Sequence, residues 1–404
     1  MGAASVTATL ARADEDAVLR GFVDAGARRE YRRLALACFL AALTNASTTL
    51  LAVVFEREGF DLHAIGLLLS AIAAPVIGFA LMSGLVMRRL GALATLRLAM
   101  GLILVGVLSF HVTRASFWPA MASRIVGGAG QGLFLASAYT YVQSRLAPTR
   151  FLFLLGVFSA TMPLAQAVAP PLGGWVLHEW GDHWLFPLAA MPAMLGLALT
   201  VGLRVLPTPP SIGGPRLFGN LPRGAWEPLA AVLMNGTLFG FCTAYLAAAM
   251  EARAIPLAAF FTASTVTMFS ARLLALRSIE SADRRALVGS GLFLMSLGLA
   301  AVAATGAKHW PVMVGGVTFG FGYSLTYPVI SAWISEGVEP EARAGPQAVL
   351  TACFNIGLFA MPLPESWLIA ALGYDGTMLV LAALGLAYAA FLCARSFARR
   401  PAPA

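Results

Sequence analysis

The stretch WPAMASRIVGGAGQG, residues 118–132, returns as WPVMVGGVTFGFGYS, residues 310–324, at an offset of 192 residues. Identical residues coincide at that offset: Trp118 with Trp310, Pro119 with Pro311, Met121 with Met313, Gly128 with Gly320, Gly130 with Gly322 and, further along, Pro170 with Pro362. The chain is therefore predicted to contain two copies of one unit. An internal repeat in an apolar chain is typical of transporters built from pseudo-symmetric halves, whose site lies where the halves meet.

Composition places the chain in the membrane class. Of its 404 residues, 59% are hydrophobic and 11% charged, and the mean hydropathy is +0.79, far from a soluble domain. Apolar runs of about 20 residues, the length that crosses a hydrocarbon core, recur along the chain, and none alternates as barrel strands do. We predict an all-α membrane protein with twelve transmembrane helices in two pseudo-symmetric six-helix halves around a central cavity. The expected spans are 34–55, 62–86, 93–113, 118–142, 151–177, 184–206, 226–249, 257–276, 286–306, 310–334, 345–367 and 376–395.

The spans divide the chain into five segments. These are a cytoplasmic N-terminal segment (1–33), a first six-helix half (34–206), a cytoplasmic linker (207–225), a second six-helix half (226–395) and a cytoplasmic tail (396–404). The linker is rich in Pro and Gly, which break regular structure. Residues 1–33 contain no apolar core of a signal peptide. Their pattern is compatible with an amphipathic helix on the membrane surface and equally with a disordered tail.

The positions of the basic residues predict the orientation. Most of the 27 Lys and Arg residues fall in cytoplasmic segments when the N-terminus is placed inside. The exceptions are Arg57, Arg114, Arg253 and Lys308 outside, and Arg124 and Arg272 within the membrane. The positive-inside rule then predicts a multi-pass protein of the cell inner membrane with both termini in the cytoplasm. The net charge of +8 describes a membrane-facing surface, and no nucleic-acid partner is expected.

The sequence offers no pattern for an enzyme. The four cysteines are widely spaced within predicted spans, and no nucleophile-base set, P-loop or dinucleotide fingerprint occurs. A cluster of His and acidic residues at 178–183 could be read as a metal site, but loop residues without fixed geometry are more often solvated. We therefore expect no enzymatic activity, cofactor or metal. The expected partners are a small-molecule substrate and membrane lipid, and the protein is expected to be a monomer.

Polar residues near the middle of the spans define a candidate substrate site. Such residues are costly in the membrane and usually face a cavity. Asn45 and Asn235 occupy nearly equivalent places in the two copies, and both are expected to line one central cavity. The candidate substrate-binding residues are Asn45, Thr48, Arg124, Gln131, Gln166, Asn235, Tyr323, Tyr327 and Asn355. The alternative for each amide is a hydrogen bond between helices.

Arg124 is the most informative candidate, because it is a permanent cation that needs a partner. No Asp or Glu lies deep within a predicted span, and the nearest, Glu251 and Glu365, are close to the outer ends. Its possible partners are a helix dipole, carbonyls, amides, water or an anionic substrate. Arg272 raises the same question, although its stem could reach the inner surface.

Two motifs, one at residues 124–130 and one at residues 156–174, resemble those of the major facilitator superfamily, and the resemblance extends over residues 34–395. Arg124, Gly128 and Gly130 match the fourth-helix motif RxxxGxG. Gly156, Ala165, Ala169, Pro170, Gly173 and Gly174 match the fifth-helix antiporter motif, with Ala in two glycine positions. The resemblance implies a secondary transporter, and the antiporter motif favours export. The second half, with GFGYSLTYP at residues 320–328, is similar to sugar-efflux and drug-efflux type members.

The chain also departs from this family. Asn355 stands where similar efflux proteins often carry Asp, so proton coupling through a buried acid is in doubt. Between spans 2 and 3 the family reads GxxxDRxGRR, whereas Gly84 is followed here by Arg88 and Arg89. We hypothesise a reversed latch in which Arg88 or Arg89 pairs with Glu339 or Glu341 on the cytoplasmic side. The candidate gating and motif residues are Gly84, Arg88, Arg89, Gly128, Gly130, Pro170, Gly173, Gly174, Arg272, Glu339 and Glu341.

The sequence thus predicts a secondary transporter that moves a small organic solute by alternating access, with export favoured. Anionic and amphipathic solutes are both compatible with the polar candidates. Two alternatives stay open: an importer of an anionic metal chelate, and a membrane scaffold or assembly factor that has the same fold but does not transport.

Overall fold

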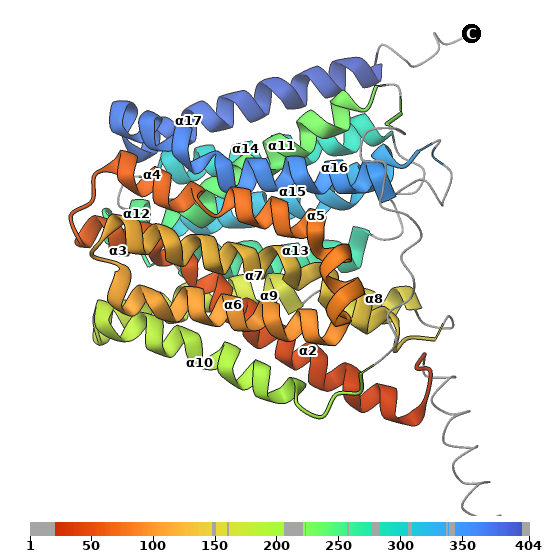
Figure 1. The fold of residues 1–404 in the computed structure, drawn as a ribbon. Helices are drawn as coiled ribbons and strands as arrows, with labels where there is room; N and C mark the ends of the chain where they lie inside the picture. Colours follow the sequence, from red (N-terminus) through yellow and green to blue (C-terminus); the bar gives the residue numbers. More distant parts are fainter. Residues whose placement is uncertain are drawn as a thin grey trace, which may run out of the picture.

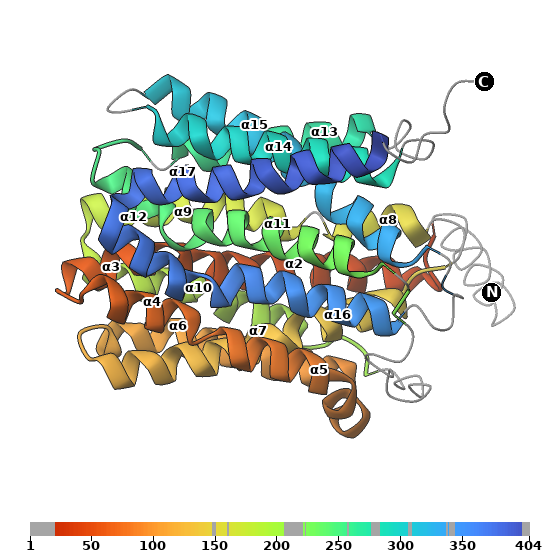
Figure 2. The same ribbon diagram turned by 90° about the horizontal axis from the view of Figure 1, so that it is seen from above.

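The computed structural model describes residues 21–147, 151–159, 161–205, 221–222, 224–256, 258–275, 283–305, 309–336, 338 and 344–397. These residues are almost entirely helical, and an isolated bridge joins Phe22 to Leu146. The helices run roughly parallel and antiparallel to one another in a single bundle (Figures 1 and 2). The described chain begins at Gly21 and stops at Phe397 on the same end of the bundle, which we call the terminal face; the opposite end is the distal face.

Residues 21–205, the N-terminal part, carry the first ten elements. They are α2 (Ala25–Ala46), the 3-10 turn η1 (Ser47–Leu50), α3 (Leu51–Arg57), α4 (Leu62–Ser70), α5 (Ala73–Leu90), α6 (Ala92–Thr113), α7 (Phe117–Gln143), α8 (Phe151–Ser159), α9 (Thr161–Glu179) and α10 (Asp182–Thr200). Of the predicted surface helix in residues 1–33, residues 1–20 lie outside the described chain.

Residues 221–397, the C-terminal part, carry the remaining elements. They are α11 (Trp226–Ala244), α12 (Leu246–Glu251), α13 (Ala258–Ala275), α14 (Arg284–Ala303), α15 (His309–Ile334), α16 (Ala344–Asn355), the π-helical turn η4 (Ile356–Ala360) and α17 (Pro362–Phe397). Gly373 interrupts α17 with a φ of 70°, a conformation that side-chain-bearing residues rarely adopt. Most of the predicted linker 207–225 lies outside the described residues.

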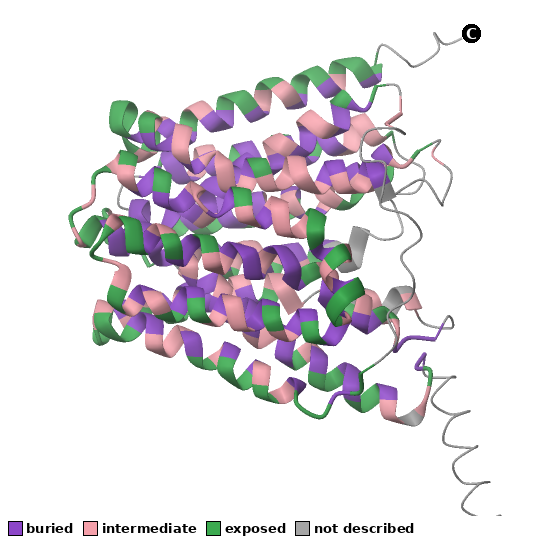
Figure 3. Cartoon of the chain, viewed as in Figure 1, coloured by how far each residue is buried: buried purple, intermediate pink, exposed green. Residues whose placement is uncertain are grey.

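The helices are suited to a membrane. Within the described part of the chain, six helical segments are long and apolar enough to cross one, judged by length and composition. The described helices overlap the spans expected from the sequence, although α17 contains both the end of the eleventh expected span and all of the twelfth. Many large apolar residues are exposed, and exposed and buried residues alternate along the outer helices (Figure 3). Trp175, Trp180, Trp184 and Trp367 are about half exposed near the distal face, as expected of aromatic residues at a membrane interface.

The internal repeat is visible in the packing contacts. A Cβ on Gly130 would lie 2.6 Å from the Ala99 carbonyl oxygen and 2.8 Å from the Ile103 nitrogen, so α7 and α6 touch backbone to backbone. In the second copy Gly322 of α15 meets Gly291 and Met295 of α14 in the same way. All three residues of the second contact are displaced by 192 positions, the offset of the sequence repeat. Close approach at glycine is what packs helices in lipid, where no hydrophobic force drives them together.

Several helices are broken at a similar depth. The turn η1 separates α2 from α3, two residues separate α4 from α5, and η4 separates α16 from α17. Pro75 explains the second break, because proline leaves the carbonyl four residues earlier without its helical donor. Irregular backbone at membrane depth is tolerated where it lines a cavity or is buried in protein. The breaks therefore mark where a cavity can be expected.

The two parts meet closely at the distal face. There α4 packs on α17 and α3 on α12, and one apolar core runs from residues such as Phe55 and Leu68 of the N-terminal part to Phe241 and Tyr245 of the C-terminal part. A second apolar core, from Phe22 to Leu203, is confined to the N-terminal part. Hydrophobic packing thus joins the parts on the distal side.

Candidate functional site

A cavity lies between the two parts at the level of the helix breaks. The space in it that is open to the centres of water-sized molecules is about 70 Å³. The polar lining consists of Asn45, Thr48, Thr49, Arg124, Gln131, Gln166 and Thr243. The apolar lining consists of Leu69, Ile72, Phe239, Ala244, Leu358, Phe359 and Pro362. Five of the nine predicted substrate-binding residues are therefore brought together, all from the N-terminal part.

Arg124 is held in the cavity wall by the break in the second span. It is 6% exposed. Its Nε donates to the Leu68 carbonyl at 3.2 Å and its Nη2 to the Leu69 carbonyl at 2.8 Å. Both carbonyls belong to the last turn of α4, which lacks helical donors beyond it. Carbonyls were one of the partners left open by the sequence, and they fix the guanidinium without neutralising it.

Comparison of the two copies shows that packing does not require this arginine. At the repeat offset, Arg124 corresponds to Gly316 and Leu68 to Phe260. A Cβ on Gly316 would lie 2.8 Å from the Phe260 carbonyl, so the second copy closes the same helix contact with glycine. In the first copy a guanidinium fills that contact and reaches the cavity. The first copy therefore carries a cation at a position where the second copy has no side chain.

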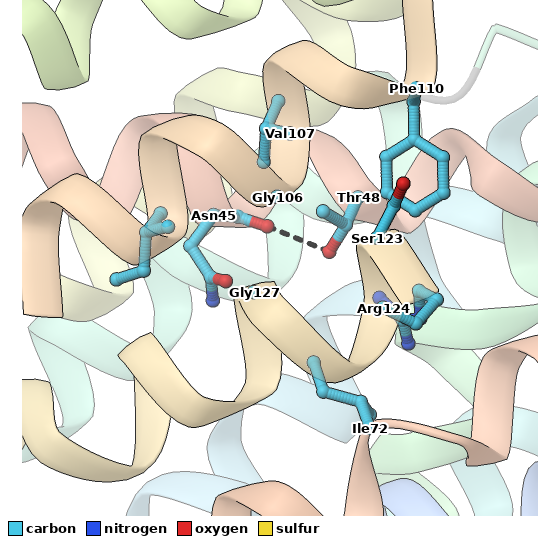
Figure 4. Close-up of a pocket in the computed structure, with 10 residues that line it drawn as sticks. Asn45, Thr48, Ile72, Gly106, Val107, Phe110, Ser123, Arg124 and Gly127 are labelled. Carbon is cyan, nitrogen blue, oxygen red and sulfur yellow. Dashed lines mark hydrogen bonds between the residues drawn. The ribbon is translucent and has the colours of Figure 1, made fainter. Parts of the chain in front are cut away.

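The neighbouring polar groups leave hydrogen-bonding capacity facing the cavity. The Thr48 hydroxyl donates to the backbone carbonyl oxygen of Asn45 at 2.7 Å (Figure 4). A small adjoining pocket is lined by Asn45, Thr48 and Arg124 together with Ser123. The Gln166 Oε1 is buried and has no hydrogen-bond partner in the described part of the chain. These amides can accept or donate to a bound solute.

The electrostatic character of the cavity is positive. Arg124 is always ionised, and no Asp or Glu is among the described residues that line the cavity. Opposite the polar side, Phe239 stacks on Tyr323 with ring centroids 4.5 Å apart. Such a site suits an anion that also carries an apolar or planar body.

The other predicted residues lie elsewhere. Asn235 is fully buried and donates to the Thr326 hydroxyl at 2.5 Å, within the C-terminal part. The structure thus shows for Asn235 the interhelical hydrogen bond that was its alternative, because Thr326 of α15 faces it. Tyr323 stacks on Phe239, and of the two rings it is Phe239 that lines the cavity. Tyr327 packs edge-on against Phe354, and Asn355 ends α16 just before η4.

Cysteine accessibility distinguishes these placements. In a background where Cys353 and Cys393 are replaced by Ser, we expect Asn45→Cys to react with a small water-soluble thiol reagent and Asn235→Cys to react at least about tenfold more slowly. The reason is that Asn45 lines the cavity and Asn235 is fully buried. Equal reaction rates, measured by mass spectrometry of labelled protein, would contradict this arrangement.

The motif residues take several positions. Gly128 packs on Ile72 and Pro75, whereas Gly84 and Gly174 have open space beside them. Pro170 lies buried within α9, and Gly173 faces Leu50. Arg88 and Arg89 are exposed in the last turn of α5. Glu339 and Glu341, the other side of the hypothesised latch, and the side chain of Arg272 lie outside the described residues.

Sequence reasoning did not propose Phe239 and Thr243 for the cavity. They follow Asn235 at intervals of four residues on α11, so they share its helix face. Extending the face from Asn235 toward the distal end would have identified both. The apolar lining residues Leu358 and Phe359 fall in η4, and a π-helical turn has no signal in the sequence that we recognise.

Polar contacts also close the distal face between the parts. Arg57 pairs with Glu251 and with Asp182, each at 2.6 Å. The Tyr374 hydroxyl donates to Glu56. Glu56 and Arg57 belong to the N-terminal part, while Glu251 and Tyr374 belong to the C-terminal part. Among the described residues, the ion pair that joins the two parts, Arg57 with Glu251, lies on this face.

Known proteins resemble this chain in sequence and in fold. The sequence matches the family profile of the Major Facilitator Superfamily over residues 34–275 and 254–404. A 102-residue stretch is 26% identical to Protein spinster homolog 3 of Danio rerio, covering 25% of this chain and 20% of that protein. The match thus spans about a fifth of that relative's length.

Solved transporters share the fold. The nucleoside transporter NupG superposes with a TM-score of 0.73 at 13% identity, covering 90% of this chain and 99% of that one. A POT family transporter in complex with a thioalcohol-conjugated peptide gives 0.73 at 14% identity, covering 92% and 96%. With the family profile matched along almost the whole length from residue 34, the chain belongs to the Major Facilitator Superfamily.

Proposed function

We propose that the protein is a secondary transporter that moves a small amphipathic organic anion through the cavity between its two parts. The observation that carries this proposal is Arg124, a buried cation that lines the cavity at a position where the repeated copy has glycine. Its carbonyl partners leave its charge uncompensated, and the described lining offers no acid. A bound anion would supply the missing charge, and the amides and the Phe239 wall would hold the rest of the solute.

The proposed mechanism of transport is alternating access, in which the cavity opens to one side of the membrane at a time. The distal face is held by Arg57, Tyr374 and the apolar core, so we take the structure as the form that is closed on the distal side. Opening the distal face would break two polar contacts between the parts. Exposed ion pairs are typically worth about 1 kcal/mol or less, so these contacts can break and re-form during a transport cycle. The latch between Arg88 or Arg89 and Glu339 or Glu341 would close the terminal face in the opposite form.

Export is the proposed direction, with the terminal face in the cytoplasm of a cell with an inner membrane. The antiporter motif around Pro170 supports it through family resemblance.

The proposed architecture is twelve spans in two six-helix halves, 34–206 and 226–395. It is supported by the helices found within the expected spans and by the repeated glycine contacts. The helices are interrupted between α4 and α5 and between α16 and α17. These interruptions favour a protein that changes conformation over a static scaffold.

A ligand screen tests the proposed function. The purified protein is heated in detergent with single members of a panel of hydrophobic carboxylates, organophosphates, neutral analogues and lipophilic cations. We expect amphipathic anions to raise the melting temperature and their neutral or cationic analogues to leave it unchanged, because a ligand that binds only the folded state stabilises it. Stabilisation by cations and not by anions would contradict the proposal.

A further inference from the structure

A cluster of arginines lies near the start of α2, at the terminal face. The sequence there is RREYRR, residues 28–33. The cluster, which we call the α2 arginines, consists of Arg28, Arg29, Arg32 and Arg33. All four are exposed. In the described part of the chain, none of them forms an ion pair or donates a side-chain hydrogen bond.

The α2 arginines share one face of their helix. At about 100° per residue they span an arc of about 140°, and Leu36, which is 49% exposed, falls within that arc. The buried residues of this end, Ala27, Tyr31 and Leu34, lie outside the arc. The exposed face thus passes from cationic to apolar within about one helical turn. This order is expected where a helix crosses from lipid headgroups to acyl chains.

The arrangement is electrostatically unfavourable unless an anion is bound. Arg28 and Arg32 are four residues apart, and so are Arg29 and Arg33, a spacing at which like charges on a helix repel each other. The N-terminal end of a helix is the positive end of its dipole, which disfavours cations there. The first turn of α2 contains no acid. An anion bound on this face would offset both effects.

The described acids beside α2 are engaged by other arginines. Glu30 is 7% exposed, and its two oxygens lie 2.5 Å from the Arg145 Nη2 and 3.3 Å from the Arg204 Nε. Asp24 accepts a hydrogen bond from the Ala27 N–H at 2.7 Å and lies 3.6 and 3.8 Å from the same two arginines. Two acids therefore face two arginines, and the α2 arginines are left without a counter-charge from either acid.

The second copy pairs its cations at the same end of the bundle. Glu227, in the first turn of α11, is 1% exposed and accepts from Arg285 at 2.6 Å and from Arg395 at 2.8 Å. Trp226, at the spacing of 190 residues that also relates the two asparagines, takes the place of Leu36. The positive-inside rule counts basic residues whether or not they are paired. It therefore does not explain why the α2 arginines lack acids.

Exposed apolar side chains adjoin the α2 arginines. The helix α10 packs along α2 (Figure 1), and Val201, directly after α10, is 68% exposed. A Cβ on Gly202 would lie 3.9 Å from the Arg33 Nη1, so this stretch is next to the arginines. A soluble anion has no use for apolar neighbours, whereas a phospholipid presents a charged headgroup and acyl chains together.

We propose that the α2 arginines bind the headgroup of an anionic phospholipid in the leaflet at the terminal face, with its acyl chains against Leu36 and Val201. The planar guanidinium fork matches the geometry of phosphate oxygens. Four or more basic residues beside a membrane helix are typical of anionic-lipid binding. The competing anions are acids of the same chain that lie outside the described residues, Asp14, Glu15 and Asp16. Lipid binding here is independent of the transported solute.

The test measures which lipid lies beside position 36 of the full-length protein. In the background where Cys353 and Cys393 are replaced by Ser, Leu36→Cys is labelled with bimane, and the protein is reconstituted in phosphatidylcholine vesicles. A small fraction of the lipid carries a nitroxide near the headgroup, on either phosphatidylglycerol or phosphatidylcholine. The ratio of quenching gives the preference between the two. We expect phosphatidylglycerol to be preferred by at least about fivefold, since one basic residue near the surface contributes about that factor.

The second copy provides the matched control. Trp226→Cys carries the same label at the corresponding position, which is 53% exposed. Because the arginines near it are paired with Glu227, the preference there should be weaker. It should also be unchanged when the α2 arginines are altered.

Replacing all four α2 arginines by Gln should reduce the preference at position 36 to about one, and replacing them by Lys should retain most of it. If the fourfold Gln variant does not fold, Arg32→Gln with Arg33→Gln should lower the preference at least about twofold. Equal quenching by the two lipids in the parent would overturn the proposal, and it is the result expected if residues 14–16 occupy the arginines. A preference that the Gln variants retain would overturn it as well. So would a preference that inorganic phosphate abolishes and sodium chloride of the same ionic strength does not, because the site would then hold a soluble anion.

Discussion

Replacing Arg124 by Gln should weaken binding of the stabilising anion by about 100-fold, or about 2.7 kcal/mol. The guanidinium is the cation of the cavity, and its two carbonyl bonds hold it in place without cancelling its charge. Gln can still donate to one carbonyl of α4, but it offers no charge. Binding is measured by calorimetry with the anion that gives the largest thermal shift.

Two further variants separate charge from packing. Arg124→Lys keeps the charge but has one donor group rather than a planar fork, so its affinity should lie between those of the parent and Arg124→Gln. Arg124→Gly reproduces the residue that the second copy uses at Gly316. It should fold and fail to bind. An affinity in Arg124→Gln equal to that of the parent would mean that the arginine only caps α4.

Replacing Gly130 by Val should destabilise the protein severely, by about 3 kcal/mol or more, and reduce the yield of monodisperse protein. A side chain there meets the backbone of α6 at Ala99 and Ile103, and backbone cannot rotate aside. Gly84→Ala is the matched control, because Gly84 is also helical and has open space beside it. It should have a melting temperature equal to that of the parent or slightly higher, since Ala favours helix. Similar melting temperatures for Gly130→Val and the parent would show that α6 and α7 can separate there without cost.

Much of the fold could be predicted from the sequence because it depends on composition and repetition. Apolar runs identify the helices, and membership of the superfamily is confirmed by the family profile. The repeat around Gly130 and Gly322 appears as equivalent helix contacts. Each of these features depends on many residues, so one atypical residue does not hide it.

The site was harder to predict because it depends on where the two copies differ. Asn45 and Asn235 look equivalent in sequence, yet Asn235 donates a hydrogen bond to Thr326 whereas Asn45 lines the cavity. Glu365 is 2% exposed, and its burial depends on helix packing that spacing along the chain does not reveal. The repeat offset does hold a usable signal: Arg124 and Glu365 are charged where the other copy has Gly316 and Gly173.

Alternating access of the cavity is the central claim, and cross-linking the distal face tests it most directly. Cysteines replace Arg57 and Glu251, which pair across the two parts, in the background lacking Cys353 and Cys393. A short bifunctional thiosulfonate reagent then links them, and reductant releases them. The matched control links Arg253→Cys to Asp375→Cys, an ion pair on the same face but within the C-terminal part.

The measurement is counterflow of the radiolabelled anion in proteoliposomes before linking, after linking and after reduction. We predict that the link between positions 57 and 251 abolishes counterflow, that reductant restores it, and that the control link leaves it unchanged. Counterflow that continues with positions 57 and 251 linked would contradict alternating access through this cavity.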